Sequence, residues 1–302
     1  MSLIDGILPH VQRPSRYIDR ELNLTSRGFD EEGFNVLLVF PDLYEIGMSH
    51  QGIRFLYDRL SGIEGVGVEF AFSPWPDMEG LMASCGEPLR SWQTRTEAGR
   101  FDCIGFSLTY ELHYTNMLAL LELSGLALEA SDRAEDDPVV VAGGPCCSNP
   151  LPFLRAVDAV FLGDGEEALV EAVLAMRTTA EGGRRAMREA LAGVEGVYVE
   201  GLTGRARYRT HRFEEPGLPR SPIVPSAAIV HDRLSVEIAR GCTRGCRFCH
   251  AGVINRPRRE RSVAEIVDAV RGGLDASGWE EVSLLSLSSS DYSCLDELLA
   301  AL

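Results

Sequence analysis

The sequence predicts an α/β protein whose first domain is a doubly wound parallel sheet. Short, continuously apolar runs alternate with segments of helical periodicity between residues 33 and 180. Continuous apolar runs of this length are typical of strands buried on both faces of a parallel sheet. Several of them end at glycine, proline or aspartate, which mark the turns after strands. Ligands of such sheets bind at the carboxyl ends of the strands, so we expect a binding site there.

A buried strand and a helix open this domain. The apolar run 35–40 stops at Pro41-Asp42, and the segment after it has apolar residues at helical spacing. Ser49 is the predicted N-cap of that helix and Gly62 its stop. The later elements follow by the same reasoning. Strands are predicted at 66–72, 103–108, 138–142 and 159–162, and helices at 53–60, 78–83, 117–123 and 166–176.

Two regions flank the sheet domain, which is assigned to residues 33–180. Residues 1–32 have mixed polarity and no sustained period, which predicts an N-terminal extension that packs on a neighbouring element. Residues 181–230 are predicted to form a β-hairpin and then a semi-rigid, proline-rich linker that marks the domain boundary. The hairpin strands are 196–200 and 206–210, and the prolines are residues 216, 219, 222 and 225.

Three cysteines at the spacing C-x3-C-x2-C follow the apolar-alternating run 234–239. They are Cys242, Cys246 and Cys249, and no other cysteine lies near them in sequence. Thiolates are soft ligands, and three on one short loop can hold three irons of a cubane cluster. The fourth iron of a [4Fe–4S] cluster would then be open to a substrate or cofactor. The spacing therefore favours a catalytic cluster over an electron-storing one.

Two other roles are open for these cysteines. They could form a zinc site completed by His250, although His250 adjoins Cys249 and zinc ligands usually come as two separated pairs. They could also be reduced structural thiols. A cluster is favoured because the spacing, the aromatic Phe248 and the preceding strand agree.

The loop resembles the cluster loop of the radical SAM enzymes, which combines this spacing with an aromatic residue directly before the last cysteine. In that family, S-adenosylmethionine chelates the open iron through its amino and carboxylate groups and is cleaved to a 5′-deoxyadenosyl radical. The stretch from Val236 to Cys242 is similar to the subgroup with an N-terminal cobalamin-binding domain. The resemblance extends from about Asn35 to the last residue. It implies a Rossmann- or flavodoxin-like domain of the B12-binding type, followed by the beginning of a radical SAM (βα) barrel.

The resemblance implies further residues that bind S-adenosylmethionine. Phe248 would pack near the adenine. In family barrels the strand after the cluster loop ends in a Gly-Gly-Glu-type motif that holds the amino group, but a serine-rich stretch stands here. Ser286 and Ser288 are therefore the candidate ligands, with Asp291 as a further hydrogen-bonding group. A serine-rich turn that caps the helix at Leu295 is the alternative.

Cobalamin is the second cofactor that the resemblance implies. Family domains often carry D-x-H-x-x-G after the first strand, with the histidine on cobalt. Asp42 and His50 are too far apart for this motif, so we expect no histidine axial ligand. Ser107 at the end of the third strand and Gly143-Gly144 after the fourth do match, and small residues let a flat corrin approach the backbone. An ordinary sheet whose Gly-Gly is only a turn is the alternative.

Other polar residues near this edge are predicted to be structural. His113 and Tyr114 open the helix after the third strand, where a cap or a surface position is expected. Cys146 and Cys147 are predicted to be small buried residues. The acidic run 163–167 begins a helix, where the macrodipole stabilises it.

Composition and charge limit the function classes. The 302 residues include 29 basic and 45 acidic side chains, for a net charge of −16, which excludes a general nucleic-acid-coating protein. Seven arginines and one acid between residues 240 and 261 could be a solvated edge, could offset cluster charge, or could receive an anionic substrate such as RNA phosphate. No run is long enough to span a bilayer and no signal peptide is evident. Eight cysteines, three of them bunched, suggest a reducing, cytoplasmic compartment.

Residues 231–302 are predicted to begin a barrel without completing it. Ser262 and Glu265 form a capping box for a helix whose apolar stripe reaches Leu274, and a strand at 282–287 follows. Two strand–helix units cannot close a parallel barrel of six to eight units. We therefore expect the N-terminal portion of a longer enzyme, or a truncated product that binds a cluster poorly.

The function implied by the resemblance is that of a cobalamin-associated radical SAM enzyme. Methyl transfer to an unactivated carbon, another radical rearrangement and RNA modification are the reactions it implies. Such an enzyme would need an electron donor such as flavodoxin or ferredoxin. Its partners would include S-adenosylmethionine, with RNA as one candidate substrate, and no membrane association is expected. The competing prediction is a non-catalytic Rossmann-like ligand-binding module with a structural zinc knuckle.

Overall fold

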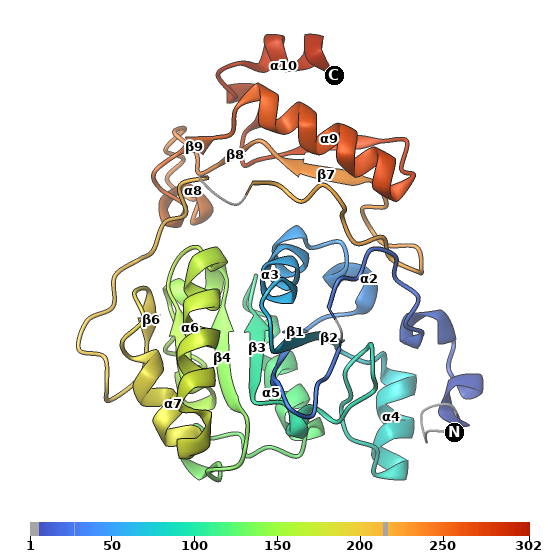
Figure 1. Cartoon of the computed structure of the whole chain (residues 1–302), viewed down its shortest axis with the longest axis vertical. Helices are drawn as coiled ribbons and strands as arrows, with labels where there is room; N and C mark the ends of the chain where they lie inside the picture. The colour runs from blue at the N-terminus through green and yellow to red at the C-terminus, as the bar shows by residue number, and fades with distance from the viewer. Residues whose placement is uncertain (1–5, 27, 214–216) are drawn as a thin grey trace. The chain divides into compact units, whose positions relative to one another are not determined.

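The computed structural model describes residues 6–26, 28–213 and 217–302, which form two compact units (Figure 1). The first unit takes in the described residues up to Arg20, Thr25–Arg209 and Ser226–Val230. The second comprises Glu21–Leu24, the described part of 210–225, and His231–Leu302. The chain therefore passes between the units several times, and the described part of the proline-rich stretch, up to Pro225, belongs to the second unit.

Within the described residues, the first unit is built on a six-stranded sheet in the order β2-β1-β3-β4-β5-β6. The first five strands are parallel and β6 is antiparallel to β5, so the predicted doubly wound α/β fold is confirmed. Every residue of β1 and β2 is buried, as their apolar character predicts. The strands are β1 Phe34–Phe40, β2 Val66–Phe72, β3 Cys103–Ser107, β4 Val139–Gly143, β5 Ala159–Phe161 and β6 Val197–Tyr198.

Helices cover both faces of this sheet. Figure 1 shows α3 and α6, which contact one another, in front of the sheet and α5 behind it. The predicted apolar residues of α5, Met117, Leu120 and Leu121, pack with the strands in one core cluster. The helices are α2 Tyr44–Gly47, α3 Gln51–Ser61, α4 Pro76–Cys85, α5 His113–Leu123, α6 Glu166–Thr179 and α7 Gly183–Leu191. Short 3₁₀ helices occupy Leu8–His10, Pro14–Tyr17, Ala98–Arg100, Ala130–Asp132, Pro145–Ser148, Leu154–Ala156, Ala180–Gly182 and Ser289–Asp291.

The strand order reverses between β1 and β3. The chain leaves β1 for β2 on one side and then crosses back to β3 on the other. In open α/β sheets the crevice outside the carboxyl ends of the strands at such a switch point is where ligands bind. The residues that follow β1 and β3 are therefore the first place to look for a site.

The N-cap of α3 differs from the sequence prediction. Ser49 lies in the turn that follows the short helix α2, where its hydroxyl donates to the Glu45 carbonyl at 2.6 Å. His50 becomes the N-cap, and its Nδ1 accepts the Ile53 N–H at 3.4 Å. The helix stops at Gly62, as predicted.

The predicted hairpin between residues 196–200 and 206–210 is wrong. Instead of pairing with residues 206–210, β6 pairs with the free edge of β5, with Val160 opposite Tyr198. Arg209 instead bridges to Gly163, whose φ is +103°. A Cβ on Gly163 would lie 2.0 Å from the Arg209 carbonyl oxygen, so only glycine permits this approach.

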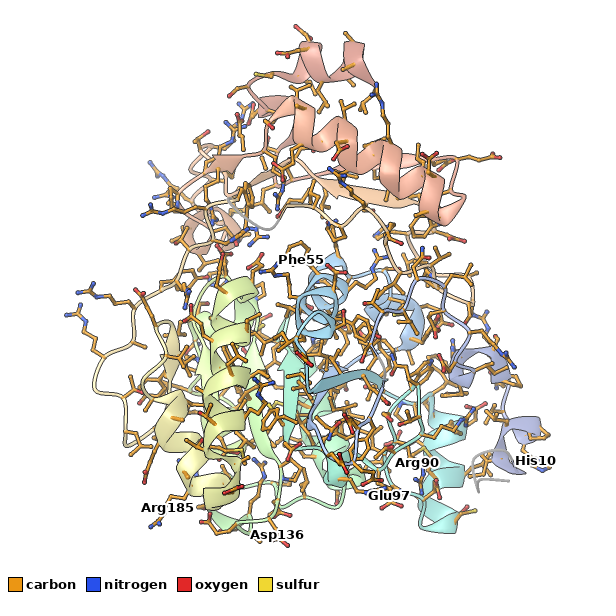
Figure 2. All side chains as sticks on the ribbon, in the orientation of Figure 1. His10, Phe55, Arg90, Glu97, Asp136 and Arg185 are labelled. Carbon is orange, nitrogen blue, oxygen red and sulfur yellow. The ribbon has the colours of Figure 1, made fainter. Side chains whose placement is uncertain are left out.

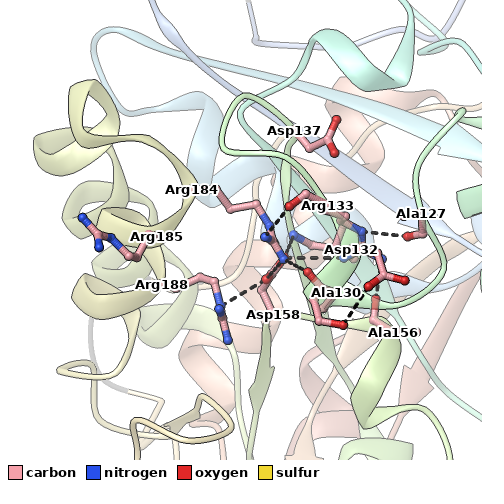
Figure 3. A network of polar contacts seen from close by, with 12 residues as sticks. Ala127, Ala130, Asp132, Arg133, Asp137, Ala156, Asp158, Arg184, Arg185 and Arg188 are labelled. Carbon is pink, nitrogen blue, oxygen red and sulfur yellow. Dashed lines mark hydrogen bonds and ion pairs between the residues drawn. The ribbon is translucent and has the colours of Figure 1, made fainter.

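A buried ion network closes the amino edge of the sheet (Figure 3). Asp158, just before β5, accepts the Val140 N–H at 2.9 Å and lies within ion-pair distance of Arg133, Arg184 and Arg188. The side chains of Asp158 and Arg133 are 0% exposed. Arg184 and Arg188 lie on α7, and Arg185 of that helix is exposed and points outward among the peripheral side chains (Figure 2).

Within its described residues, the second unit is built on a strand–helix–strand repeat. β7 and β10 pair in parallel, with Val282 opposite Leu234, and α9 packs on β7. The predicted cap of α9 is confirmed, because the Ser262 hydroxyl oxygen accepts the Glu265 N–H at 3.2 Å. The elements are β7 Leu234–Glu237, β8 Ala239–Arg240, α8 Ala251–Ile254, β9 Arg259–Glu260, α9 Val263–Ser277, β10 Val282–Leu285 and α10 Leu295–Ala301.

The N-terminal segment packs on the first unit. Ile7, Val11 and Tyr17 form a small core with Met78 and Met82 of α4, as the predicted extension requires. Among the described residues, no helix combines the length and the apolar character that crossing a membrane demands.

Candidate functional site

The three-cysteine loop leaves β8 through a glycine that the structure requires. Gly241 has φ +83°, and a Cβ there would lie 2.5 Å from the Asn255 carbonyl oxygen. The start of the loop is thereby pressed against the segment after α8. Within the loop the Cys249 N–H donates to the Cys246 carbonyl at 3.1 Å, which turns the chain back on itself.

Two of the thiols receive backbone hydrogen bonds. The Arg244 N–H donates to Cys242 Sγ at 3.4 Å and the Gly252 N–H donates to Cys249 Sγ at 3.3 Å, while Cys246 is exposed. Such bonds stabilise a thiolate and are one of the ways a protein tunes a cluster. The chemistry of the donor set therefore fits an iron–sulfur cluster.

The sulfurs do not surround one point in this structure. Among the residues it describes, no three cysteine, histidine or acidic side chains converge as metal ligands. Cluster binding therefore requires the thiols on this loop to reorient. The same applies to the alternative zinc site with His250.

An ion pair joins the cysteine loop to the loop after β10. Arg244 Nε donates to Asp291 Oδ2 at 2.6 Å, and the second guanidinium arm bonds the other carboxylate oxygen. The Ser288 hydroxyl donates to the same carboxylate at 2.7 Å. The hydrogen bond from Arg244, and then that from Ser288, hold the pKa of Asp291 below its ordinary value. The second unit thus brings the predicted cluster loop and serine-rich loop together.

The serines themselves form a turn. Ser286 Oγ lies 3.0 Å from Ser289 Oγ and accepts the Ser288 N–H at 3.2 Å. The turn of the alternative interpretation is therefore present, but it does not cap the helix at Leu295, whose N-cap is Cys294 without a side-chain hydrogen bond. Binding of S-adenosylmethionine by Ser286 and Ser288 stays a prediction. Phe248 is 92% exposed at the tip of the cysteine loop, available to a ligand.

The arginine-rich segment is largely paired within the second unit. Among the described residues, at least four of its seven arginines have an acidic partner: Arg240 with Glu237, Arg244 with Asp291, Arg258 with Glu260 and Arg261 with Glu265. The Arg261 guanidinium also lies 4.1 Å from the Phe213 ring centroid. These pairs reduce the charge that the segment offers to an anionic substrate.

A polar cluster at the β1–β3 switch point was not predicted. Asp42 follows β1, whereas Tyr110 and His113 follow β3. The Tyr110 hydroxyl donates to Asp42 Oδ2 at 2.5 Å, and His113 Nε2 lies 3.7 Å from the same oxygen. The Leu43 N–H donates to Asp42 Oδ1 at 2.8 Å. The Phe40 ring packs on His113 at a centroid distance of 5.0 Å.

The prediction of a cap or surface role for His113 is wrong. Its side chain is 0% exposed, and Nδ1 lies 3.3 Å from both the Thr109 N–H donor and the Ser107 carbonyl oxygen. Among the described residues Nε2 has no hydrogen-bond partner. Burial is the main reason that the pKa of His113 is lowered, so the imidazole is neutral near pH 7.

The neighbouring groups of the cluster are also uncharged near pH 7. The hydrogen bond to Asp42 raises the pKa of Tyr110 to about 12. Burial, with smaller effects of Arg54 and His113, lowers the pKa of His50 to about 4. His50 is held as the N-cap of α3, and Asp42 bonds Tyr110 instead, in keeping with the absence of D-x-H-x-x-G.

The three residues predicted to contact cobalamin differ in how tightly the surrounding backbone packs on them. Ser107 ends β3 and is half-buried. Gly144 has φ +107°, and a Cβ there would lie 2.6 Å from the Leu108 carbonyl oxygen, so backbone packing alone requires this glycine. Gly143 would tolerate a Cβ, which would lie 3.7 Å from Phe161 Cβ. The turn interpretation therefore explains Gly144, and binding of cobalamin by Ser107, Gly143 and Gly144 stays a prediction.

Exposed apolar side chains lie in the loops that follow β3 and β4. Tyr110 is 37%, Leu112 71% and Leu151 77% exposed. A large, partly apolar cofactor would bury such residues. The sequence signal for this site was the placement of Asp42, Tyr110 and His113 directly after neighbouring strands, which requires the strand order to be known.

Comparison with known proteins shows the family context. Residues 52–200 match the family described as radical SAM proteins, N-terminal. This segment of the chain is similar to that family. The predicted resemblance to the radical SAM proteins is confirmed.

Two solved structures of TsrM, a radical S-adenosylmethionine methyltransferase from Kitasatospora setae, share the fold. The one with cobalamin and a [4Fe–4S] cluster bound aligns with a TM-score of 0.56 at 16% identity, over 89% of this chain and 52% of TsrM. The one with tryptophan and a SAM analogue bound aligns with a TM-score of 0.53 at 16% identity, over 88% and 50%.

Two relatives are similar in sequence. The uncharacterized protein MJ0966 of Methanocaldococcus jannaschii is 24% identical over 271 residues, 87% of this chain and 51% of that protein. The threonylcarbamoyladenosine tRNA methylthiotransferase MtaB of Treponema pallidum is 30% identical over 99 residues, 31% of this chain and 20% of MtaB. The chain thus spans about half the length of MJ0966 and of TsrM.

Proposed function

We propose that this chain belongs to a radical SAM enzyme in which Cys242, Cys246 and Cys249 hold a [4Fe–4S] cluster. The observation that carries the proposal is a short loop with three thiols, two of which accept backbone N–H bonds. The family match and the TsrM fold support it. Three thiolate ligands leave one iron for S-adenosylmethionine, and a bound cluster supplies the electron that cleaves this sulfonium.

The residues around the loop have defined tasks in this proposal. The Arg244–Asp291 ion pair holds the cysteine loop beside the serine-rich loop, and Gly241 lets the start of the cysteine loop lie against Asn255. The exposed Phe248 contacts the adenine, and Ser286 and Ser288 exchange hydrogen bonds within their turn for bonds to the ligand. Asp291 can hold these serines in place through its bond from Ser288.

The first unit, with its core in residues 33–180, is proposed to bind cobalamin at the carboxyl edge of its sheet. Its exposed apolar residues after β3 and β4, and the buried His113 Nε2 that lacks a partner among the described residues, fit a ligand at this edge. Methyl transfer or RNA modification is the proposed reaction class, because TsrM is a methyltransferase and MtaB a tRNA methylthiotransferase. Flavodoxin or ferredoxin is the proposed electron donor and the cytoplasm the proposed compartment.

Anaerobic reconstitution of the full chain with iron and sulfide tests the cluster. We expect a charge-transfer band near ~400 nm and about four irons per chain, both lost in the Cys242→Ala/Cys246→Ala/Cys249→Ala variant. Cys294→Ala is the matched control, because Cys294 is an exposed cysteine of the same unit. One bound zinc without iron would instead identify a structural zinc knuckle. Loss of iron in the Cys294→Ala control would show that Cys294 is a fourth ligand, which would leave no iron open to S-adenosylmethionine.

A further inference from the structure

The Asp42–Tyr110–His113 cluster has the properties of a ligand-binding group and not of a structural one. It lies at the switch point of the sheet, outside the carboxyl ends of β1 and β3. Burial of an imidazole nitrogen without a hydrogen-bond partner destabilises the folded state. The fold accepts this cost at His113 Nε2, which faces the Asp42 carboxylate at 3.7 Å. A structural histidine would be expected to use both ring nitrogens.

Asp42 is fixed from three directions. Its Oδ1 accepts the Leu43 N–H, its Oδ2 accepts the Tyr110 hydroxyl, and the His113 ring closes the remaining side. The His113 ring is itself held by the Phe40 ring and by the contacts of Nδ1 with Ser107 and Thr109. This arrangement leaves Asp42 little freedom to turn toward another partner.

Tyr110 is the member of the cluster that reaches solvent. Its ring lies 4.1 Å from the His113 ring, centroid to centroid, and 37% of the residue is exposed. Its O–H bond is committed to a carboxylate, which draws the proton away and increases the electron density on the phenol oxygen. The lone pairs of that oxygen remain for an electron-poor centre. The switch point thus offers one oriented, electron-rich oxygen.

We propose that the Tyr110 oxygen is the protein group that contacts cobalt in bound cobalamin, with Asp42 and His113 as positioning residues that aim it. The inference rests on the proposed binding of cobalamin by the first unit. Tyr110 would supply an oxygen contact to cobalt in a chain that lacks the D-x-H-x-x-G histidine. His50 does not take that role, because it is held as the N-cap of α3. A phenol is a harder, weaker donor to cobalt than an imidazole, so the contact would leave the metal close to its ligand-free reactivity.

The test uses the full chain loaded with hydroxocobalamin, freed of excess and reduced to cob(II)alamin. We expect Tyr110→Phe to retain cobalamin with an affinity reduced no more than tenfold, and to change the cobalt hyperfine pattern of the electron paramagnetic resonance spectrum. Asp42→Asn should shift the spectrum in the same direction by a smaller amount. Tyr114→Phe is the matched control, because Tyr114 bonds Cys146 and not Asp42. The control should reproduce the wild-type spectrum.

Two results would overturn the inference in different ways. A wild-type spectrum in Tyr110→Phe with cobalamin bound would refute the tyrosine contact and leave cobalamin binding intact. Failure of the wild-type chain to retain any cobalamin would refute both. If Tyr110→Phe fails to fold, the wild-type protein in ¹⁷O-enriched water decides, because line broadening would identify water on cobalt in place of Tyr110.

Discussion

The two edges of the first unit's sheet bury polar groups in opposite ways. At the amino edge, the Asp158 carboxylate is surrounded by Arg133, Arg184 and Arg188 and accepts a backbone N–H (Figure 3). At the carboxyl edge, Asp42 has one hydroxyl and one N–H donor, and a neutral histidine beside it. Paired buried charges hold elements together, whereas incompletely paired groups mark a place that can take a ligand. The difference separates the structural edge of the sheet from its candidate site.

The largest effect should follow loss of the charge at the amino edge. Asp158→Ala leaves buried guanidinium groups without their carboxylate and should lower the free energy of unfolding by about 3–5 kcal/mol. Urea unfolding measures it. Asp136→Ala, at an exposed acid nearby, should stay within about 0.5 kcal/mol of wild type. A loss below about 1 kcal/mol at Asp158 would contradict the structural assignment of this edge.

The carboxyl edge should instead make stability depend on pH. His50 has a pKa of about 4 when folded and an ordinary value of 6.5 when unfolded, so the unfolded chain binds the extra proton first. Its contribution is complete above pH 6.5 and is lost as pH falls toward 4, by about 3 kcal/mol. His50→Asn, which keeps a capping side chain, should flatten this part of the unfolding profile. A slope equal to that of wild type would show that His50 is not the group responsible.

Gly144 should be sensitive for backbone reasons alone. Gly144→Ala forces a left-handed φ and brings Cβ toward the Leu108 carbonyl, and should cost about 1–3 kcal/mol. Gly143→Ala is the matched comparison and should change stability by less than about 1 kcal/mol, because its Cβ meets only an ordinary contact. Thermal unfolding of the two variants checks the order. Equal losses would show that the two glycines share one constraint.

The smallest change is expected where a partner is missing. His113→Phe removes the unpartnered Nε2 and also the Nδ1 contacts with Thr109 and Ser107, but keeps a ring to pack on Phe40, so stability should fall by about 0.5–1.5 kcal/mol. Chemical denaturation with the same probe as for Asp158→Ala gives the comparison. A loss comparable to that at Asp158 would mean that His113 is a structural residue and would weaken the assignment of this edge as a site.

The sequence predicted those features that depend on neighbouring residues. The strand 35–40 and the cap Ser262–Glu265 were correct because burial on both faces and capping leave local patterns. The hairpin was wrong because the partner of Val197–Tyr198 is β5, an edge more than thirty residues earlier. His113 was misassigned because a helix start usually exposes its residues, and Asp42 was not known to lie opposite.

By itself the sequence determined the α/β class, the order of the main elements and the three thiols at Cys242, Cys246 and Cys249, since apolar period and ligand spacing are local properties. Only the tertiary structure decided that the sheet reverses between β1 and β3, and so brought Asp42 beside Tyr110 and His113. The physical reason is that strand order is set by long-range backbone pairing, which no short stretch of sequence records.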